Sequence, residues 1–143
     1  MEAFGSEVFR TMTSASAEQV WDALTATGRP LEHLYGLATC SDWRVGSTIS
    51  VGLPGSPCLH GHGPLVGDVL ALEPGRRLSY SLGEEPGHAT VYVTWEVAPH
   101  ACGAVIQLTV DEPDAGTAEE IDACWGPVIR ALTADLDRRA SSA

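Results

Sequence analysis

The spacing of apolar positions changes twice along the chain, and each change marks a switch between strand and helix. A short strand is predicted from Glu7 to Thr13. Ser16 and Gln19 then form a capping-box pattern ahead of apolar residues at helical spacing, so we expect a helix that stops near Gly28. A second, shorter helix is predicted over residues 30–36, with a proline at its first position and a glycine at its end.

From Ala38 to Asp111 the apolar period becomes two, which is typical of strands with one buried face. The clearest alternation places four apolar residues on one side of a strand: Val91, Val93, Trp95 and Val97. Clusters of Pro and Gly separate these short runs where hairpin turns are needed. The pattern therefore predicts an antiparallel meander.

A helical apolar stripe returns at the end of the chain and predicts a long helix of roughly residues 117 to 138. Gly126-Pro127 interrupts this stripe. Because proline lacks a backbone donor and clashes with the preceding turn, we expect a kink or a break into two helices there. No repeat or interdomain linker divides the sequence, so residues 1–143 are expected to form a single domain.

The charge of the chain excludes some partners. Eight Arg, no Lys and nineteen Asp or Glu give a net charge of −11, which repels nucleic acids and anionic membranes. No apolar run approaches the roughly 18 residues of a membrane helix, and the N-terminus lacks a signal peptide, so a cytoplasmic protein is expected. The lack of Lys beside abundant Ala, Gly and Arg suggests a GC-rich, bacterial genome. In a reducing compartment all four cysteines are expected to be free thiols: Cys40, Cys58, Cys102 and Cys124.

The predicted order of one strand, two short helices, antiparallel strands and a long final helix resembles the START-like, or SRPBCC, superfamily. Its motifs resemble the branch named for the activator of the heat-shock-protein ATPase: Arg10, Ala17 to Thr25, Ser41 to Ser47, Gly67 to Tyr80 and Val93 to Val97. The resemblance runs from about residue 7 to 138. It implies an α+β helix-grip fold, in which a curved antiparallel sheet wraps round the C-terminal helix. It also implies a cavity between the two that binds lipids, hormones or polyketides in different members.

Six residues are predicted to line this cavity, and several of them offer aromatic faces to a flat ligand: Leu34, Trp43, Tyr80, Trp95, Trp125 and Ile129. Core packing is the alternative for each, because an apolar pocket and an apolar core use the same residue types. Trp21, on the stripe of the first helix, is interpreted as core. The stripe of the final helix could likewise be the inner face of a lid.

Candidate proton-transfer groups are His33, Tyr35 and Asp68, which the sequence places nearest to a cavity mouth. The alternative is that each is a solvated side chain. Glu96 has the parity of an outward-facing residue. The sequence contains no Ser-His-Asp order, phosphate-binding loop or dinucleotide fingerprint, and no cofactor is expected.

Cys58, His60 and His62 are spaced so that an extended segment would place all three on one side, and Cys40 could add a fourth ligand for zinc. The stretch is rich in Gly and Pro, however, and matches no standard zinc spacing. A hairpin without metal is therefore the prediction.

These observations favour a cytoplasmic protein that binds a small hydrophobic or aromatic molecule and carries or sequesters it. The first alternative is a polyketide cyclase-like or hydrolase-like enzyme that uses the same cavity. The second is a co-chaperone-like interaction domain, which an unusually large exposed apolar patch would favour. A monomer or a homodimer is expected.

Overall fold

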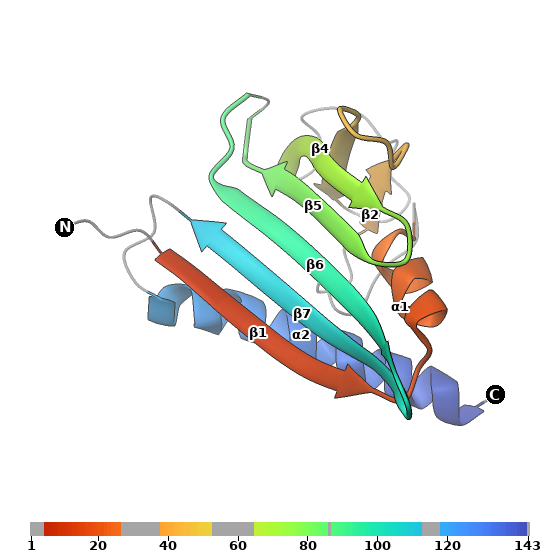
Figure 1. Ribbon diagram of the computed structural model, residues 1–143. Helices are drawn as coiled ribbons and strands as arrows, with labels where there is room; N and C mark the ends of the chain where they lie inside the picture. Colours follow the sequence, from red (N-terminus) through yellow and green to blue (C-terminus); the bar gives the residue numbers. More distant parts are fainter. Residues whose placement is uncertain (1–4, 27–37, 53–64, 86, 113–117, 143) are drawn as a thin grey trace.

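The computed structural model describes residues 5–26, 38–52, 65–85, 87–112 and 118–142 (Figure 1). Its elements follow the order β1 (Gly5–Thr13), α1 (Ala17–Leu24), β2 (Ala38–Ser41), β3 (Thr48–Gly52), β4 (Leu65–Glu73), β5 (Arg77–Leu82), β6 (Val91–His100), β7 (Gly103–Glu112) and α2 (Ala118–Ser142). All seven strands form one antiparallel sheet in the order β1-β7-β6-β5-β4-β3-β2. Figure 1 shows α2 running along one face of this sheet, behind β1 and β7.

The predicted α+β class, with an antiparallel sheet and a long C-terminal helix, is confirmed, and the arrangement is consistent with a helix grip. The second short helix, predicted over residues 30–36, lies outside the described residues. Helix α1 forms where the capping box predicts it. The Ser16 N–H donates to Gln19 Oε1 at 2.8 Å, and the Gln19 N–H donates to Ser16 Oγ at 3.1 Å.

The alternation predicted for the strands decides which face of the sheet is buried. In β6, Val91, Val93, Trp95 and Val97 are buried, whereas the residues between them are exposed or half-buried. We call this buried side, which packs on α2, the inner face, and the opposite side the outer face. From α2, a stripe at helical spacing completes the core: Trp125, Val128, Ile129, Leu132 and Leu136.

Of the two predicted outcomes at Gly126-Pro127, the break into two helices is wrong, because α2 continues through Pro127 as one helix of 25 residues, and the kink stays a prediction. Buried residues lie on both sides of the proline, at Trp125 and Val128. Their packing against the same sheet face offsets the backbone hydrogen bond that proline cannot make. Among the described residues, neither helix is long and apolar enough to cross a membrane.

Candidate functional site

The centre of the inner face is a hydrogen-bonded aromatic pair, Tyr80 and Trp95. Strands β5 and β6 pair Tyr80 with Val93, so Trp95 lies diagonally across from Tyr80 on the same face. The Trp95 indole N–H donates to the Tyr80 hydroxyl oxygen at 3.0 Å. Tyr80 is 6% exposed and Trp95 1% exposed, so this bond is shielded from water.

The hydroxyl of Tyr80 is a donor at neutral pH. Burial raises the pKa of Tyr80 to about 12, and the hydrogen bond from Trp95 opposes this rise only in part. The phenol therefore keeps its proton. Its oxygen accepts from Trp95, but the described part of the chain offers no acceptor for the proton itself. A buried donor in this state is suited to an acceptor supplied by a bound molecule.

Helix α2 adds Trp125 and Ile129 to the same buried cluster; they lie one turn apart and are 7% and 5% exposed. The Trp125 indole N–H donates to Glu112 Oε2 at 3.2 Å, at the end of β7. This bond fixes the orientation of the indole. One buried cluster thus contains four of the predicted cavity-lining residues: Tyr80, Trp95, Trp125 and Ile129. This burial is expected of cavity-lining residues and of core residues alike.

Trp43 lies in the turn between β2 and β3 and packs, half-buried, against the same cluster. Its backbone has a φ of 54°, in the left-handed region that bulky residues rarely adopt. The Trp43 N–H donates to Ser41 Oγ at 3.0 Å, which holds the turn closed.

The remaining candidates are placed differently. Leu34, His33 and Tyr35 lie outside the described residues. Asp68 is exposed on β4, and its backbone N–H donates to Ser81 Oγ. Glu96 points to the outer face, as its parity predicted.

The expectation of four free thiols is wrong for Cys40, which is disulfide-bonded. Cys102 is free and exposed. Pairing depends on distances within the fold, which compartment and composition do not reveal. The metal-binding alternative at Cys58, His60 and His62 lies outside the described residues, so the absence of zinc remains a prediction.

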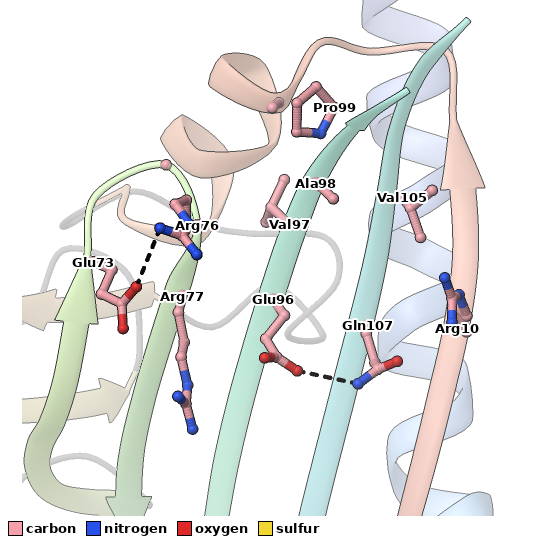
Figure 2. Close-up of a pocket in the computed structure, with 12 residues that line it drawn as sticks. Arg10, Glu73, Arg76, Arg77, Glu96, Val97, Ala98, Pro99, Val105 and Gln107 are labelled. Carbon is pink, nitrogen blue, oxygen red and sulfur yellow. Dashed lines mark hydrogen bonds and ion pairs between the residues drawn. The ribbon is translucent and has the colours of Figure 1, made fainter. Parts of the chain in front are cut away.

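Sequence reasoning did not identify a second site, an open hollow of about 720 Å³ on the outer face (Figure 2). Its polar lining comes from five strands and the turn before β5: Arg10, Glu73, Arg76, Arg77, Glu96 and Gln107. The signal that the sequence offered for this site was the position of Glu96 in the strand alternation, which predicted an outward-facing side chain. The grouping with Arg10 depends on the register between β1 and β7, which the sequence did not supply.

An antiparallel sheet packed on a long C-terminal helix defines an α+β protein, in an arrangement consistent with a helix grip. The family model described as "Activator of Hsp90 ATPase homolog 1-like protein" matches residues 14–137, and the chain belongs to this family. None of the curated proteins matches the chain.

Solved structures share the fold at low sequence identity. ChR145 from Cytophaga hutchinsonii is 23% identical, with a TM-score of 0.73 and 99% of each chain covered. CalU16 from Micromonospora echinospora is 21% identical, with a TM-score of 0.68 over 99% of this chain and 90% of that one. The Aha1 dimer from Colwellia psychrerythraea is 18% identical, with a TM-score of 0.68 over 92% of this chain and 96% of that one. At these identities the likeness establishes the fold alone.

Proposed function

We propose that the chain binds a small hydrophobic or aromatic molecule between the inner face of the sheet and α2, and carries or sequesters it. The observation that supports this most directly is the Tyr80 hydroxyl, a buried donor whose proton has no acceptor in the described part of the chain. Trp95 contacts this hydroxyl, and Trp125 adds a second large aromatic surface to the same buried cluster. The ligand class that fits is a flat apolar molecule with a carbonyl or similar acceptor.

The chemistry of the Tyr80 hydroxyl favours binding over catalysis. A phenol with a pKa of about 12 donates a hydrogen bond at neutral pH but exchanges its proton poorly as an acid or base. Asp68 is exposed on β4. His33 and Tyr35 remain the candidates of the alternative, a polyketide cyclase-like or hydrolase-like enzyme, and a substitution at either would then reduce turnover.

The test uses two probes of nearly equal shape, 2-acetylnaphthalene and 2-ethylnaphthalene, of which only the first carries a carbonyl. Binding is followed by tryptophan fluorescence and by the rise in melting temperature. Tyr80→Phe is expected to weaken the ketone about fivefold to tenfold, since one hydrogen bond contributes about 1 kcal/mol, and to leave the hydrocarbon unchanged. Trp125→Ala is expected to weaken both probes.

Tyr92→Phe is the matched control, because Tyr92 lies on the neighbouring strand but is 39% exposed. It should leave both affinities unchanged. Absence of saturable binding by either probe, or an equal loss for ketone and hydrocarbon in Tyr80→Phe, would contradict the proposed role of Tyr80. Recovery of a converted product in place of the added ketone would favour the enzyme.

For location we propose the cytoplasm, and for assembly a monomer or a homodimer. The dimer formed by the Colwellia relative, which has the same fold, supports the second form. Sedimentation equilibrium distinguishes the two, since the chain has a mass of 15.1 kDa.

A further inference from the structure

Four polar residues lie side by side on the outer face, on four neighbouring strands, and we call them the arginine row: Arg77, Glu96, Gln107 and Arg10. The register pairs Arg77 with Glu96, Glu96 with Gln107, and Gln107 with Arg10. Paired positions project from the same face of a sheet. Since Trp95 and Val97 are buried, the row between them faces away from α2 (Figure 2).

Both carboxylates that line this hollow are already engaged. Glu73 forms an ion pair with Arg76 at 3.8 Å. Glu96 Oε1 accepts a hydrogen bond from Gln107 Nε2 at 3.1 Å, which turns its carboxylate toward β7 (Figure 2). Within the described residues, Arg10 and Arg77 therefore have no ion pair or hydrogen bond from their side chains.

Most described arginines of this acidic chain, in which Asp and Glu outnumber Arg by nineteen to eight, do have a carboxylate partner. Arg44 pairs with Asp42, and Arg138 and Arg139 both pair with Asp135. Guanidinium groups that stand at the two ends of a hollow with no carboxylate of their own are available to anionic groups of a ligand.

We propose that the outer hollow is a second binding site, for an elongated small molecule with an anionic group at each end. Three strand spacings of about 4.8 Å place the Cα atoms of Arg10 and Arg77 roughly 14 Å apart. Glu96 stands between them and repels an anion from the middle of the row. A ligand with one anionic group at each arginine spans this separation and keeps its charges away from Glu96. A single anion between the two arginines would do neither.

The rest of the lining specifies the body of this molecule. Gln107 uses its amide N–H on Glu96, so Gln107 Oε1 and Glu96 Oε2 are left as acceptors for a hydroxyl or N–H of the ligand. Ala98, Pro99 and Val105 line the same hollow and suit a hydrocarbon segment. A volume of about 720 Å³ lies within the range of small-molecule sites, roughly 300 to 1,000 Å³. A dicarboxylate with a hydrocarbon body is the class that fits.

The experiment compares decanedioate, which has two carboxylates, with decanoate, which has one. Binding is followed by the NMR signals of the arginine Nε–H and tryptophan indole N–H groups in the intact chain. Decanedioate is expected to shift the signals of Arg10 and Arg77 saturably and to leave those of Trp95 and Trp125 in place. Arg10→Gln and Arg77→Gln should each weaken this binding about threefold to fivefold, as exposed ion pairs do.

Two further variants provide a control and a test of the central negative charge. Arg44→Gln is the matched control, an exposed arginine elsewhere on the surface, and should leave the affinity unchanged. Glu96→Gln removes the central negative charge and should tighten binding of the diacid. Equal affinity of decanedioate and decanoate, or no effect of Arg77→Gln, would overturn the proposal.

The proposals for the outer site and the inner site can be contradicted independently of each other. A diacid that shifts only the Trp95 and Trp125 indoles would bind on the inner face, which overturns the outer site and leaves the proposed function standing. Conversely, naphthalene probes that do not bind would count against the inner site without any bearing on Arg10 and Arg77.

Discussion

Trp43 is the one non-glycine residue in the described part of the chain with a positive φ, 54°. The left-handed conformation brings Cβ close to the following carbonyl and costs a side-chain-bearing residue roughly 1 to 2 kcal/mol. Packing of the indole against the core offsets this cost. The turn thus keeps a large aromatic group at the edge of the buried cluster, which is the arrangement expected of a residue that contacts a ligand.

This strain predicts an unusual order of stability at position 43. Trp43→Ala and Trp43→Gly both remove the indole, but only alanine still carries the Cβ that makes the conformation costly. The glycine variant is expected to be more stable than the alanine variant by about 1 kcal/mol, measured by urea denaturation. An alanine variant as stable as the glycine variant would show that the backbone is not held in this conformation.

Tyr80 predicts a loss of stability at alkaline pH. Its pKa is about 12 in the folded chain, above the ordinary value of 10.0, so the folded state holds this proton more tightly than the unfolded state does. The stabilisation is complete below pH 10 and is lost as the pH rises from about 10 to about 12, by up to roughly 2 to 3 kcal/mol. In denaturation curves across this range, Tyr80→Phe should have a shallower pH dependence than Tyr92→Phe. Parallel curves for the two variants would count against the shift.

At the scale of elements, α2 is tied to the sheet near both ends of its described side chains. Trp125 bonds to Glu112 at the end of β7. Twelve residues later, Asp137 Oδ1 accepts from Thr13 Oγ1 at 2.6 Å, from the Ser14 N–H at 2.9 Å and from Ser14 Oγ at 3.2 Å. The apolar stripe predicted this helix and its buried face. It could not predict the ties, because their partners are distant in sequence.

The tie at Asp137 predicts a loss of stability in acid. Hydrogen bonds from Thr13 and Ser14 lower the pKa of Asp137, so folding is stabilised above the ordinary pKa of an aspartate, and this contribution is lost as the pH falls through the lowered value. Asp137→Asn should cost about 1 kcal/mol at pH 7, since the site is partly exposed, and should flatten the stability curve below about pH 4. Asp42→Asn is a suitable control because Asp42 is exposed and paired only with Arg44. Equal acid sensitivity of the two variants would argue against this tie.

At the scale of the whole molecule, local patterns predicted the elements but not their neighbours. Period two identified the buried faces of β5, β6 and β7, because burial of alternate residues needs no knowledge of the partner strand. The arginine row and the disulfide at Cys40 were missed for the opposite reason. Both depend on which distant segments meet, and one sequence gives no measure of that. The ligand-lining roles of Tyr80 and Trp95 stay predictions, since burial suits a core residue equally well.

The pairing of β1 with β7 also constrains how the nascent chain acquires its structure. Gly5 lies opposite Glu112 and Thr13 opposite Ala104, so β1 is made well before its partner, which follows about a hundred residues later. Hairpins such as β4 with β5 can close early, because their partners are adjacent in sequence. Until β7 and α2 have been made, β1 lacks both of the elements that it contacts most. Newly made chains are therefore most prone to aggregation, and most in need of a holding chaperone, in the interval before β7 and α2 have been made.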